Sequence, residues 1–121
     1  VTVEGTTKHA EARQASRTIA SSPLVKAAIH GNDPNWGRIV AALGRSEVEV
    51  REDKLDIYLN GICVMEQGCP ESFSKEETRV ALSNNDSVLI KVCLNLGNGK
   101  ATAWGCDLSE EYVRINSEYT T

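Results

Sequence analysis

The end of the 121-residue chain, SEEYVRINSEYTT, carries side chains whose chemistry suits a small amino acid. Tyr112, Ile115 and Tyr119 would dock a short terminal helix against the rest of the domain. Docking would fix the amide of Asn116 and the hydroxyl of Thr121 beside a carboxylate, and such a set could bind a zwitterion. The alternative is a frayed chain end, which is common in domains of this size. The residue types alone leave both interpretations open.

The hexapeptide DPNWGR, residues 33–38, is a second candidate. Asp33 is typical of a helix cap, and Pro34 of a first helical position. These preferences leave Asn35 and Arg38 unexplained. The two side chains either belong to a functional site or tie neighbouring loops together, as polar side chains often do.

Four cysteines and two histidines offer no metal motif. No two cysteines are separated by two residues, and His9 and His30 lie far from every cysteine, so we expect no zinc site. The number of cysteines would allow disulfides, but we expect reduced and mostly buried thiols. The residues concerned are Cys63, Cys69, Cys93 and Cys106.

The segment GNGKAT, residues 97–102, has only a superficial likeness to a phosphate-binding loop. Leu94 stands where that motif needs its first glycine, and Ala101 stands where it needs serine or threonine. We therefore interpret residues 97–99 as a turn between two strands.

The composition predicts a globular domain that binds neither nucleic acid nor a membrane. Thirteen Lys and Arg residues against 17 Asp and Glu residues give a net charge of −4, and no basic run is present. Apolar runs are only a few residues long, and the chain opens without a signal-like segment. These features favour a cytoplasmic protein.

Hydrophobic periodicity predicts helices first and strands afterwards. We expect a strand at residues 1–3, a helix capped by Thr6 or Thr7 and running to about Ala20, a helix capped by Ser22 and ended by Gly31, and a helix opened by Asp33 and ended by Gly44. Later elements are expected at 48–50, 55–59, 62–64, 74–83, 88–94, 101–106 and, as a short terminal helix, from 109. This order indicates an α+β fold with N-terminal helices packed on a mainly antiparallel sheet.

The hairpin at residues 55–64 is the most specific of these predictions. Asn-Gly at 60–61 suits a two-residue turn because both turn positions need positive φ. Such a turn would pair Leu59 with Ile62 and Ile57 with Val64.

Three segments, IASSPLVKAAIHGNDPNWGRIVAALG, ATAWGCDLS and YVRINSEYTT, resemble the C-terminal third of ornithine acetyltransferases. These enzymes are the glutamate N-acetyltransferases of arginine biosynthesis. The resemblance runs over essentially the whole chain. It implies one C-terminal domain, residues 1–121, in which residues 1–45 bridge to a catalytic domain and residues 46–121 form a small α+β domain.

The resemblance implies acetyl transfer from N2-acetylornithine to glutamate. Family members cleave themselves, and the new N-terminal threonine carries the acetyl group as an ester between the half-reactions. That threonine, the oxyanion-hole residues, a substrate lysine and a substrate glutamate are expected upstream of Val1. No catalytic residue is then expected in this chain, and the isolated chain should be inactive.

The resemblance also implies partners. These are the α chain and the remainder of the β chain of an α2β2 enzyme. No cofactor is expected, although bifunctional members also take acetyl from acetyl-coenzyme A. We expect a cytoplasmic location, with an organelle as the alternative for a eukaryotic member.

Two substrate contacts of the family match this chain. They are Asn116 and Thr121, which would hold the amino-acid part of ornithine or glutamate. The family usually has INADY where this chain has INSEY, and the changes at Ser117 and Glu118 spare both positions. Trp36 and the neighbouring glycine are expected to seat their helix against the upstream domain. The alternative is a domain without catalytic function that binds an amino acid or acts as a scaffold.

Overall fold

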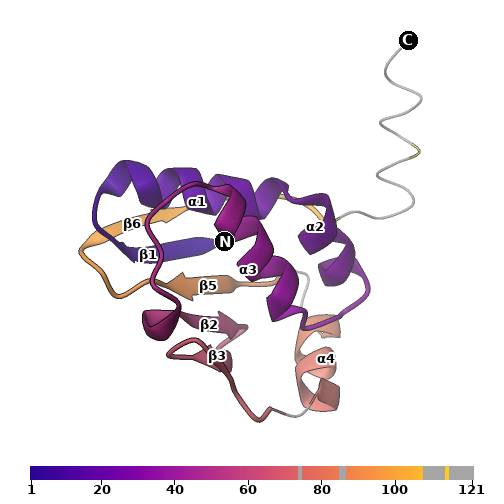
Figure 1. Ribbon diagram of the computed structural model, residues 1–121. Helices are drawn as coiled ribbons and strands as arrows, with labels where there is room; N and C mark the ends of the chain where they lie inside the picture. Colours follow the sequence, from indigo (N-terminus) through magenta and orange to yellow (C-terminus); the bar gives the residue numbers. More distant parts are fainter. Residues whose placement is uncertain (74, 85–86, 108–113, 115–121) are drawn as a thin grey trace.

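The computed structural model describes residues 1–73, 75–84, 87–107 and 114 (Figure 1). Three successive helices follow the first strand, and the other strands come after them with one helix inserted, which is the segregated order expected for an α+β fold. The helices are α1 (His9–Ser21), α2 (Pro23–His30), α3 (Trp36–Arg45) and α4 (Lys75–Ser83), with a 3-10 turn at Glu52–Lys54. The strands are β1 (Thr2–Thr6), β2 (Asp56–Leu59), β3 (Ile62–Glu66), β4 (Cys69–Pro70), β5 (Ile90–Cys93) and β6 (Gly99–Thr102).

The strands form one sheet with the order β4-β3-β2-β5-β1-β6. Only the β1–β5 pair is parallel among the described pairings, so the sheet is mainly antiparallel, as predicted. β1 comes from the start of the chain and lies between β5 and β6 from its end. The first strand of the chain is therefore paired with the last two described strands on one side of the sheet.

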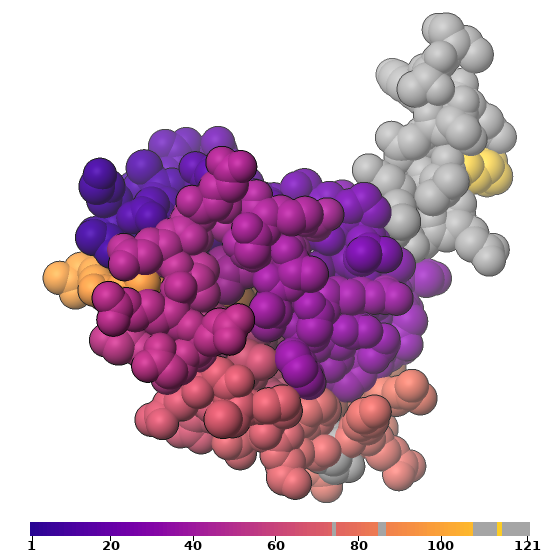
Figure 2. Space-filling model, viewed as in Figure 1, coloured from indigo at the N-terminus to yellow at the C-terminus, as the bar shows by residue number. Residues whose placement is uncertain are grey.

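One face of the sheet is covered by helices. α1 packs on β1 and β6, and α2 and α3 pack against α1. Figure 2, drawn in the same view as Figure 1, shows α2, α3 and the loop that follows α3 across the middle of this face. Alternate strand residues point into the resulting core. The fully buried ones include Val3, Ile57, Leu59, Val64 and Val92.

Two helices begin later than predicted. The helix expected to be capped by Thr6 or Thr7 begins at His9, and the side chain of Glu11 accepts a hydrogen bond from the backbone nitrogen of Lys8 at 3.1 Å. Thr6 is instead the last residue of β1, and its hydroxyl donates to the carbonyl of Lys8 at 2.7 Å.

The helix expected to open at Asp33 begins at Trp36. Its cap is Asn35, whose side-chain oxygen accepts from the backbone nitrogen of Arg38 at 3.1 Å. The middle helix behaves as predicted, because Ser22 caps α2 and Gly31 follows its last residue.

Residues 48–50 do not form the predicted strand. The backbone nitrogen of Glu49 donates to the side chain of Glu11 at 3.3 Å, and the side chain of Gln14 donates to the carbonyl of Ser46. Glu47 adopts a positive φ of 62°, which interrupts an extended conformation. The segment is therefore a loop fastened to α1, and Val48 and Val50 are only partly buried against the core.

The Asn-Gly hairpin is confirmed, but its register is only half as predicted. Asn60 and Gly61 have φ values of 47° and 82°, and Leu59 pairs with Ile62. A bulge between Ile57 and Tyr58 then shifts the ladder, so that Ile57 pairs with Met65 instead of Val64.

The remaining predicted elements differ mainly in length. β5 is shorter than the predicted strand 88–94, and β6 begins and ends earlier than the predicted strand 101–106. The cap residue predicted for α4, Ser74, and the predicted terminal helix from 109 lie outside the described residues, apart from Arg114. Every helix within the described ranges is too short or too polar to cross a bilayer.

Candidate functional site

The two predicted substrate contacts, Asn116 and Thr121, lie outside the described residues. The last continuous described segment before them is residues 103–107, which follow β6. We call this segment the tail root. The tail root is the part of the described chain that leads toward Asn116 and Thr121.

The tail root contacts the body of the domain at three points. The backbone nitrogen of Ala103 donates to the carbonyl of Val1 at 2.8 Å. Gly105 packs on the last turn of α1, where a Cβ added to it would lie 3.1 Å from the carbonyl oxygen of Ala20. Nδ1 of His30 and Oδ2 of Asp107 are 3.0 Å apart. These contacts join the root to β1, α1 and α2.

A hollow of about 530 Å³ lies beside the tail root. The ends of α2 and α4, the residues before β5 and the root itself form its walls, which include Ala20, Lys26, His30, Val88, Trp104 and Asp107. Trp104 is 87% exposed, the most exposed of the large hydrophobic side chains described. Hydrogen-bonding groups beside an exposed aromatic ring suit a polar molecule or a peptide segment.

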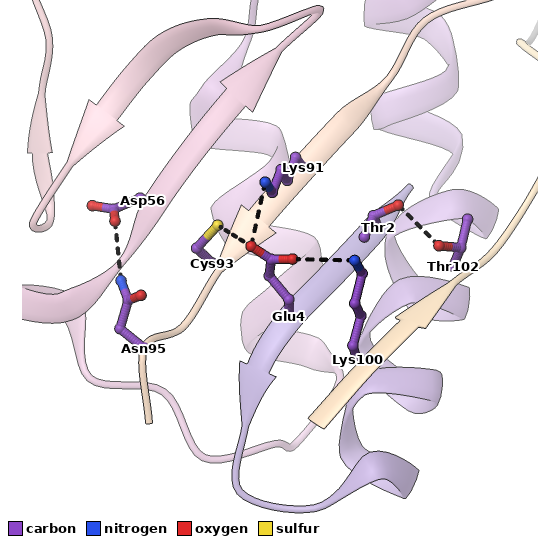
Figure 3. A network of polar contacts seen from close by, with 8 residues as sticks. All are labelled: Thr2, Glu4, Asp56, Lys91, Cys93, Asn95, Lys100 and Thr102. Carbon is purple, nitrogen blue, oxygen red and sulfur yellow. Dashed lines mark hydrogen bonds and ion pairs between the residues drawn. The ribbon is translucent and has the colours of Figure 1, made fainter. Parts of the chain in front are cut away.

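A second polar cluster lies on the opposite face of the sheet from α1 (Figure 3). The carboxylate of Glu4 on β1 lies 3.3 Å from Nζ of Lys91 on β5 and 3.7 Å from Nζ of Lys100 on β6. The thiol of Cys93 donates to the same carboxylate at 3.3 Å. We call these four residues the Glu4 cluster.

The open face carries two further contacts that Figure 3 shows beside the Glu4 cluster. The hydroxyls of Thr2 and Thr102 are 2.9 Å apart, and the side-chain amide of Asn95 donates to Asp56 at 3.0 Å. Each of these pairs joins neighbouring parts of the sheet. Polar groups on this face are thus satisfied by one another.

The protonation of the Glu4 cluster argues against catalysis there. Burial raises the pKa of Glu4, but hydrogen bonds from Cys93 and Lys91 and the charges of both lysines outweigh burial and lower it. Burial, followed by the hydrogen bond to Glu4, raises the pKa of Cys93 to about 11. A nucleophilic cysteine needs a lowered pKa, and a general acid needs a raised one. We therefore interpret the cluster as a structural link between β5, β1 and β6.

The hexapeptide DPNWGR forms the connection between α2 and α3. Asn35 caps α3 and its amide also donates to the carboxylate of Asp33 at 3.2 Å. The guanidinium of Arg38 donates to the carbonyl of Leu24 at 3.0 Å, which ties α3 to the first turn of α2. The two side chains that the sequence left unexplained thus have structural contacts.

Trp36 and Gly37 of that hexapeptide differ in their surroundings. Trp36 is partly buried against the core of this chain. Gly37 is exposed, and a Cβ added to it would meet only the side chain of Asn35, at 3.4 Å. The space over Gly37 is thus open within the described residues, and its predicted packing against an upstream domain stays a prediction.

The cysteines are free thiols, but they are not mostly buried. Only Cys93 is buried, Cys63 is partly exposed, and Cys69 and Cys106 are exposed. The described part of the chain holds no group of three or more His, Cys, Asp or Glu residues that could bind a metal ion. His9 and His30 are both exposed at helix ends.

The GNGKAT segment is a turn leading into β6, as predicted. Gly99 pairs with Thr6 at a bulge in β1, and a Cβ added to Gly99 would lie 2.0 Å from the hydroxyl of Thr6. Here the glycine is needed for close packing of the turn, and not for a phosphate.

Sequence reasoning missed the pairing of His30 with Asp107. The two residues are 77 positions apart, and no local pattern connects them. The only signal was indirect: each lies within a segment that carries the family resemblance, IASSPLVKAAIHGNDPNWGRIVAALG and ATAWGCDLS.

Comparison with known proteins identifies a family and relatives similar to this chain. The model of the ArgJ family matches residues 1–121. The chain is 50% identical over 121 residues to the "Arginine biosynthesis bifunctional protein ArgJ" of Dehalococcoides mccartyi and 46% identical to that of Bacillus anthracis. It is covered completely in both cases and spans about 30% of the length of each relative.

A solved structure agrees with the fold. The crystal structure of the arginine biosynthesis bifunctional protein ArgJ from Bacillus halodurans matches with a TM-score of 0.93 at 45% sequence identity. The match covers 98% of this chain and 55% of the solved chain. Since the family model covers the whole chain, this protein belongs to the ArgJ family.

Proposed function

We propose that this chain serves arginine biosynthesis as part of a glutamate N-acetyltransferase that moves acetyl from N2-acetylornithine to glutamate. The observation that carries the proposal is the match of the family model to all 121 residues. The names of the relatives support the pathway, and the sequence resemblance supplies the reaction.

The reaction would run in two half-reactions. A threonine hydroxyl attacks the acetyl carbonyl of N2-acetylornithine, the ornithine amine leaves with a proton, and the acetyl group remains as an ester. The amine of glutamate then attacks that ester and releases the threonine hydroxyl. We place the threonine, and the donors that stabilise the oxyanion, in the part of the enzyme that is additional to these 121 residues.

The role proposed for this chain is substrate binding by its tail. The amide of Asn116 and the hydroxyl of Thr121 would hold the amino and carboxylate groups that ornithine and glutamate share. Recognition of this shared part explains how one site would serve both half-reactions. The chemistry needs no cofactor, and acetyl-coenzyme A would be an alternative acetyl donor in a bifunctional enzyme.

The partners proposed are the α chain and the rest of the β chain of the same enzyme, assembled as α2β2 in the cytoplasm. The chain's 30% share of its curated relatives is consistent with a need for such a partner. Under this proposal, residues 1–121 alone would not transfer acetyl groups.

The test is a chimera in which this chain replaces the matching 30% of the Bacillus anthracis relative. Acetyl transfer from N2-acetylornithine to glutamate is measured for the chimera, for Asn116→Ala and for a deletion of Thr121. Loss of one hydrogen bond to a charged substrate group costs about 1.5–3 kcal/mol, so kcat/KM should fall at least tenfold. Asn98→Ala, in the exposed turn before β6, is the matched control and should leave kcat/KM unchanged.

An active chimera with unchanged kinetics in both tail variants would show that the tail does not bind substrate. The chain would then act as a scaffold for the rest of the enzyme. A chimera that folds but binds amino acids without transferring acetyl would favour a binding domain without catalytic function.

A further inference from the structure

We propose that the hollow beside the tail root is a docking site for the chain segment that precedes Val1 in the complete enzyme, added there as a continuation of β1. The inference rests on the proposed function and the family resemblance for one point, that the rest of the enzyme lies upstream of this chain. It goes beyond them by giving that segment a place in the sheet and a pattern of side chains.

The hydrogen bonds between β1 and the chain after β6 continue up to the first residue. The backbone nitrogen of Val1 donates to the carbonyl of Ala103 at 2.9 Å, and the nitrogen of Ala103 donates to the carbonyl of Val1 at 2.8 Å. A peptide nitrogen has the one N–H that the first bond needs. Both bonds follow the antiparallel register that pairs Thr2 with Thr102. In this register, the residue before Val1 would lie opposite Trp104.

The parallel neighbour of β1 gives the same position independently. The register between β1 and β5 pairs Thr2 with Lys91. The residue before Val1 would therefore lie beside Leu89, and the one before it beside Val88. An extended β1 would thus run between residues 88–89 on one side and the tail root on the other.

The hollow lies at this position. Its walls include Val1, Val88, Ile90 and residues 103–105, so it separates the two segments that would flank the added strand. Figure 1 shows the N-terminus at the end of β1 nearer α2 and α4, which supply further walls. Leu89 is 50% exposed and Trp104 is 87% exposed, and a strand between the two segments would pack beside both side chains.

The alternation along β1 predicts the side chains of the added segment. Val3 is buried under the helices, whereas Glu4 lies on the open face. With a period of two, the residue before Val1 would face the open side, and the second residue upstream would face the helices. Val25 and Leu82 line the hollow there, so the second residue upstream should be apolar.

The relatives have enough chain to supply this segment. The 121 residues span about 30% of the length of the curated relatives and 55% of the solved chain. A segment joined directly to Val1 would be held beside the hollow at a high effective concentration. A second copy of this chain would instead have to bring a strand to the same place by association in solution.

The test is a disulfide in the chimera described above, detected by oxidation and peptide mass spectrometry. Because Val1 and Ala103 form a hydrogen-bonded pair, the next pair along the strands has Cα atoms only about 4.5 Å apart, which a disulfide can span. Trp104→Cys, combined with cysteine in place of the residue before Val1, should therefore form a disulfide in most molecules. Cys106→Ser is included in every variant to remove the nearest native thiol.

Thr102→Cys with the same upstream cysteine is the matched control. It places a thiol on the same strand two residues out of register, where Cα atoms are roughly 7–8 Å apart and a disulfide is strained. Its oxidation should be at least about tenfold slower. Thr102 and Trp104 are both exposed, so neither change should harm the fold. The same pairs are also built at the aligned positions of the Bacillus anthracis relative, which has no chimeric junction.

A second measurement tests the predicted pattern of side chains. Aspartate in place of the second residue upstream of Val1 would bury a charge near Val25 and Leu82, and should lower the unfolding midpoint of the chimera by at least about 3 °C. Aspartate one residue later, on the open face, is the control and should change the midpoint by less than about 1 °C.

Equal oxidation rates for the two cysteine pairs would overturn the inference, and so would a disulfide that links two copies of the chimera. Equal losses of stability from the two aspartates would contradict the strand as well. Acetyl transfer is measured on the same preparations before oxidation. The expected disulfide without acetyl transfer would refute the proposed function and leave the docking site, whereas transfer without the disulfide would refute the docking site alone.

Discussion

The two faces of the sheet have opposite chemistry although they share every strand. On β5, Val92 points under the helices and is fully buried, whereas its neighbours Lys91 and Cys93 meet Glu4 on the open face. On β1, Val3 is buried in the same core and Glu4 lies on the other side. The period of two along a strand accounts for the alternation.

The comparison separates two ways of holding strands together. The covered face depends on apolar area removed from water, which is the dominant favourable term in folding. On the open face the carboxylate of Glu4 contacts Lys91, Lys100 and Cys93, so that the loss of one partner leaves two others in place. Neither arrangement requires a function, and a cluster of carboxylate, lysines and thiol on a strand face is therefore weak evidence for an active site.

The largest expected effect is on the covered face. Ile57→Ala removes three heavy atoms from a fully buried side chain on β2 and should lower the free energy of unfolding by about 2–5 kcal/mol. Chemical denaturation followed by circular dichroism measures the change. Ile57→Val is the graded control and should cost about 0.5–1.5 kcal/mol. Equal losses in the two variants would contradict a cavity-based explanation.

The open face should protect the thiol of Cys93 from chemical modification. Cys93 is buried, and its pKa of about 11 leaves it protonated at neutral pH, so a maleimide should label it at least about tenfold more slowly than the exposed Cys69 and Cys106. Peptide mass spectrometry over time at pH 7.5 gives the three rates. Glu4→Ala should speed labelling of Cys93 alone. Uniform rates in the unsubstituted chain would show that the Glu4 cluster does not shield the thiol.

Sequence patterns predicted the elements that depend on residues close together in the chain. Asn-Gly at 60–61 indicated the hairpin, and Ser22 indicated the cap of α2, because turn and cap preferences act within a few residues. The failures involve distant partners. Gln14 and Glu11 hold the loop at Ser46 and Glu49, the second of these 38 positions away from Glu11. Alternating valines in the sequence do not reveal these hydrogen bonds.

The same distinction between local patterns and distant partners applies to the candidate site. The residue types of the tail made Asn116 and Thr121 candidates but left a frayed chain end equally open, and the resemblance to a family is what favoured substrate binding; both residues remain predictions. The pairing of His30 with Asp107 depends on the sheet order, which brings β6 beside β1 and carries the tail root to the end of α2. Such contacts can be recognised only once the fold is known.

The charge of Glu4 should have a smaller effect on the free energy of unfolding. Its pKa is below the ordinary value of 4.5 in the folded chain, so the carboxylate stabilises the fold above pH 4.5, and this contribution disappears as the pH falls through the lowered pKa. Glu4→Gln should therefore cost about 1 kcal/mol at pH 7 and almost nothing at pH 2–3. Denaturation at both pH values measures it, with the exposed Glu71→Gln as control. A penalty that persists at low pH would point to packing instead of charge.

The smallest expected change in the free energy of unfolding tests whether the partners of Glu4 on the open face can replace one another. Lys100 is 65% exposed and lies 3.7 Å from Glu4, farther than Lys91 at 3.3 Å. Lys100→Ala should change the free energy of unfolding by less than about 0.5 kcal/mol, because an exposed ion pair contributes little and Lys91 and Cys93 still hold the carboxylate. The double variant with Lys91→Ala should lose more than the sum of the single changes, since Glu4 then retains only the thiol. Denaturation of the three variants at low salt measures this coupling, and strict additivity would show that the two lysines act independently.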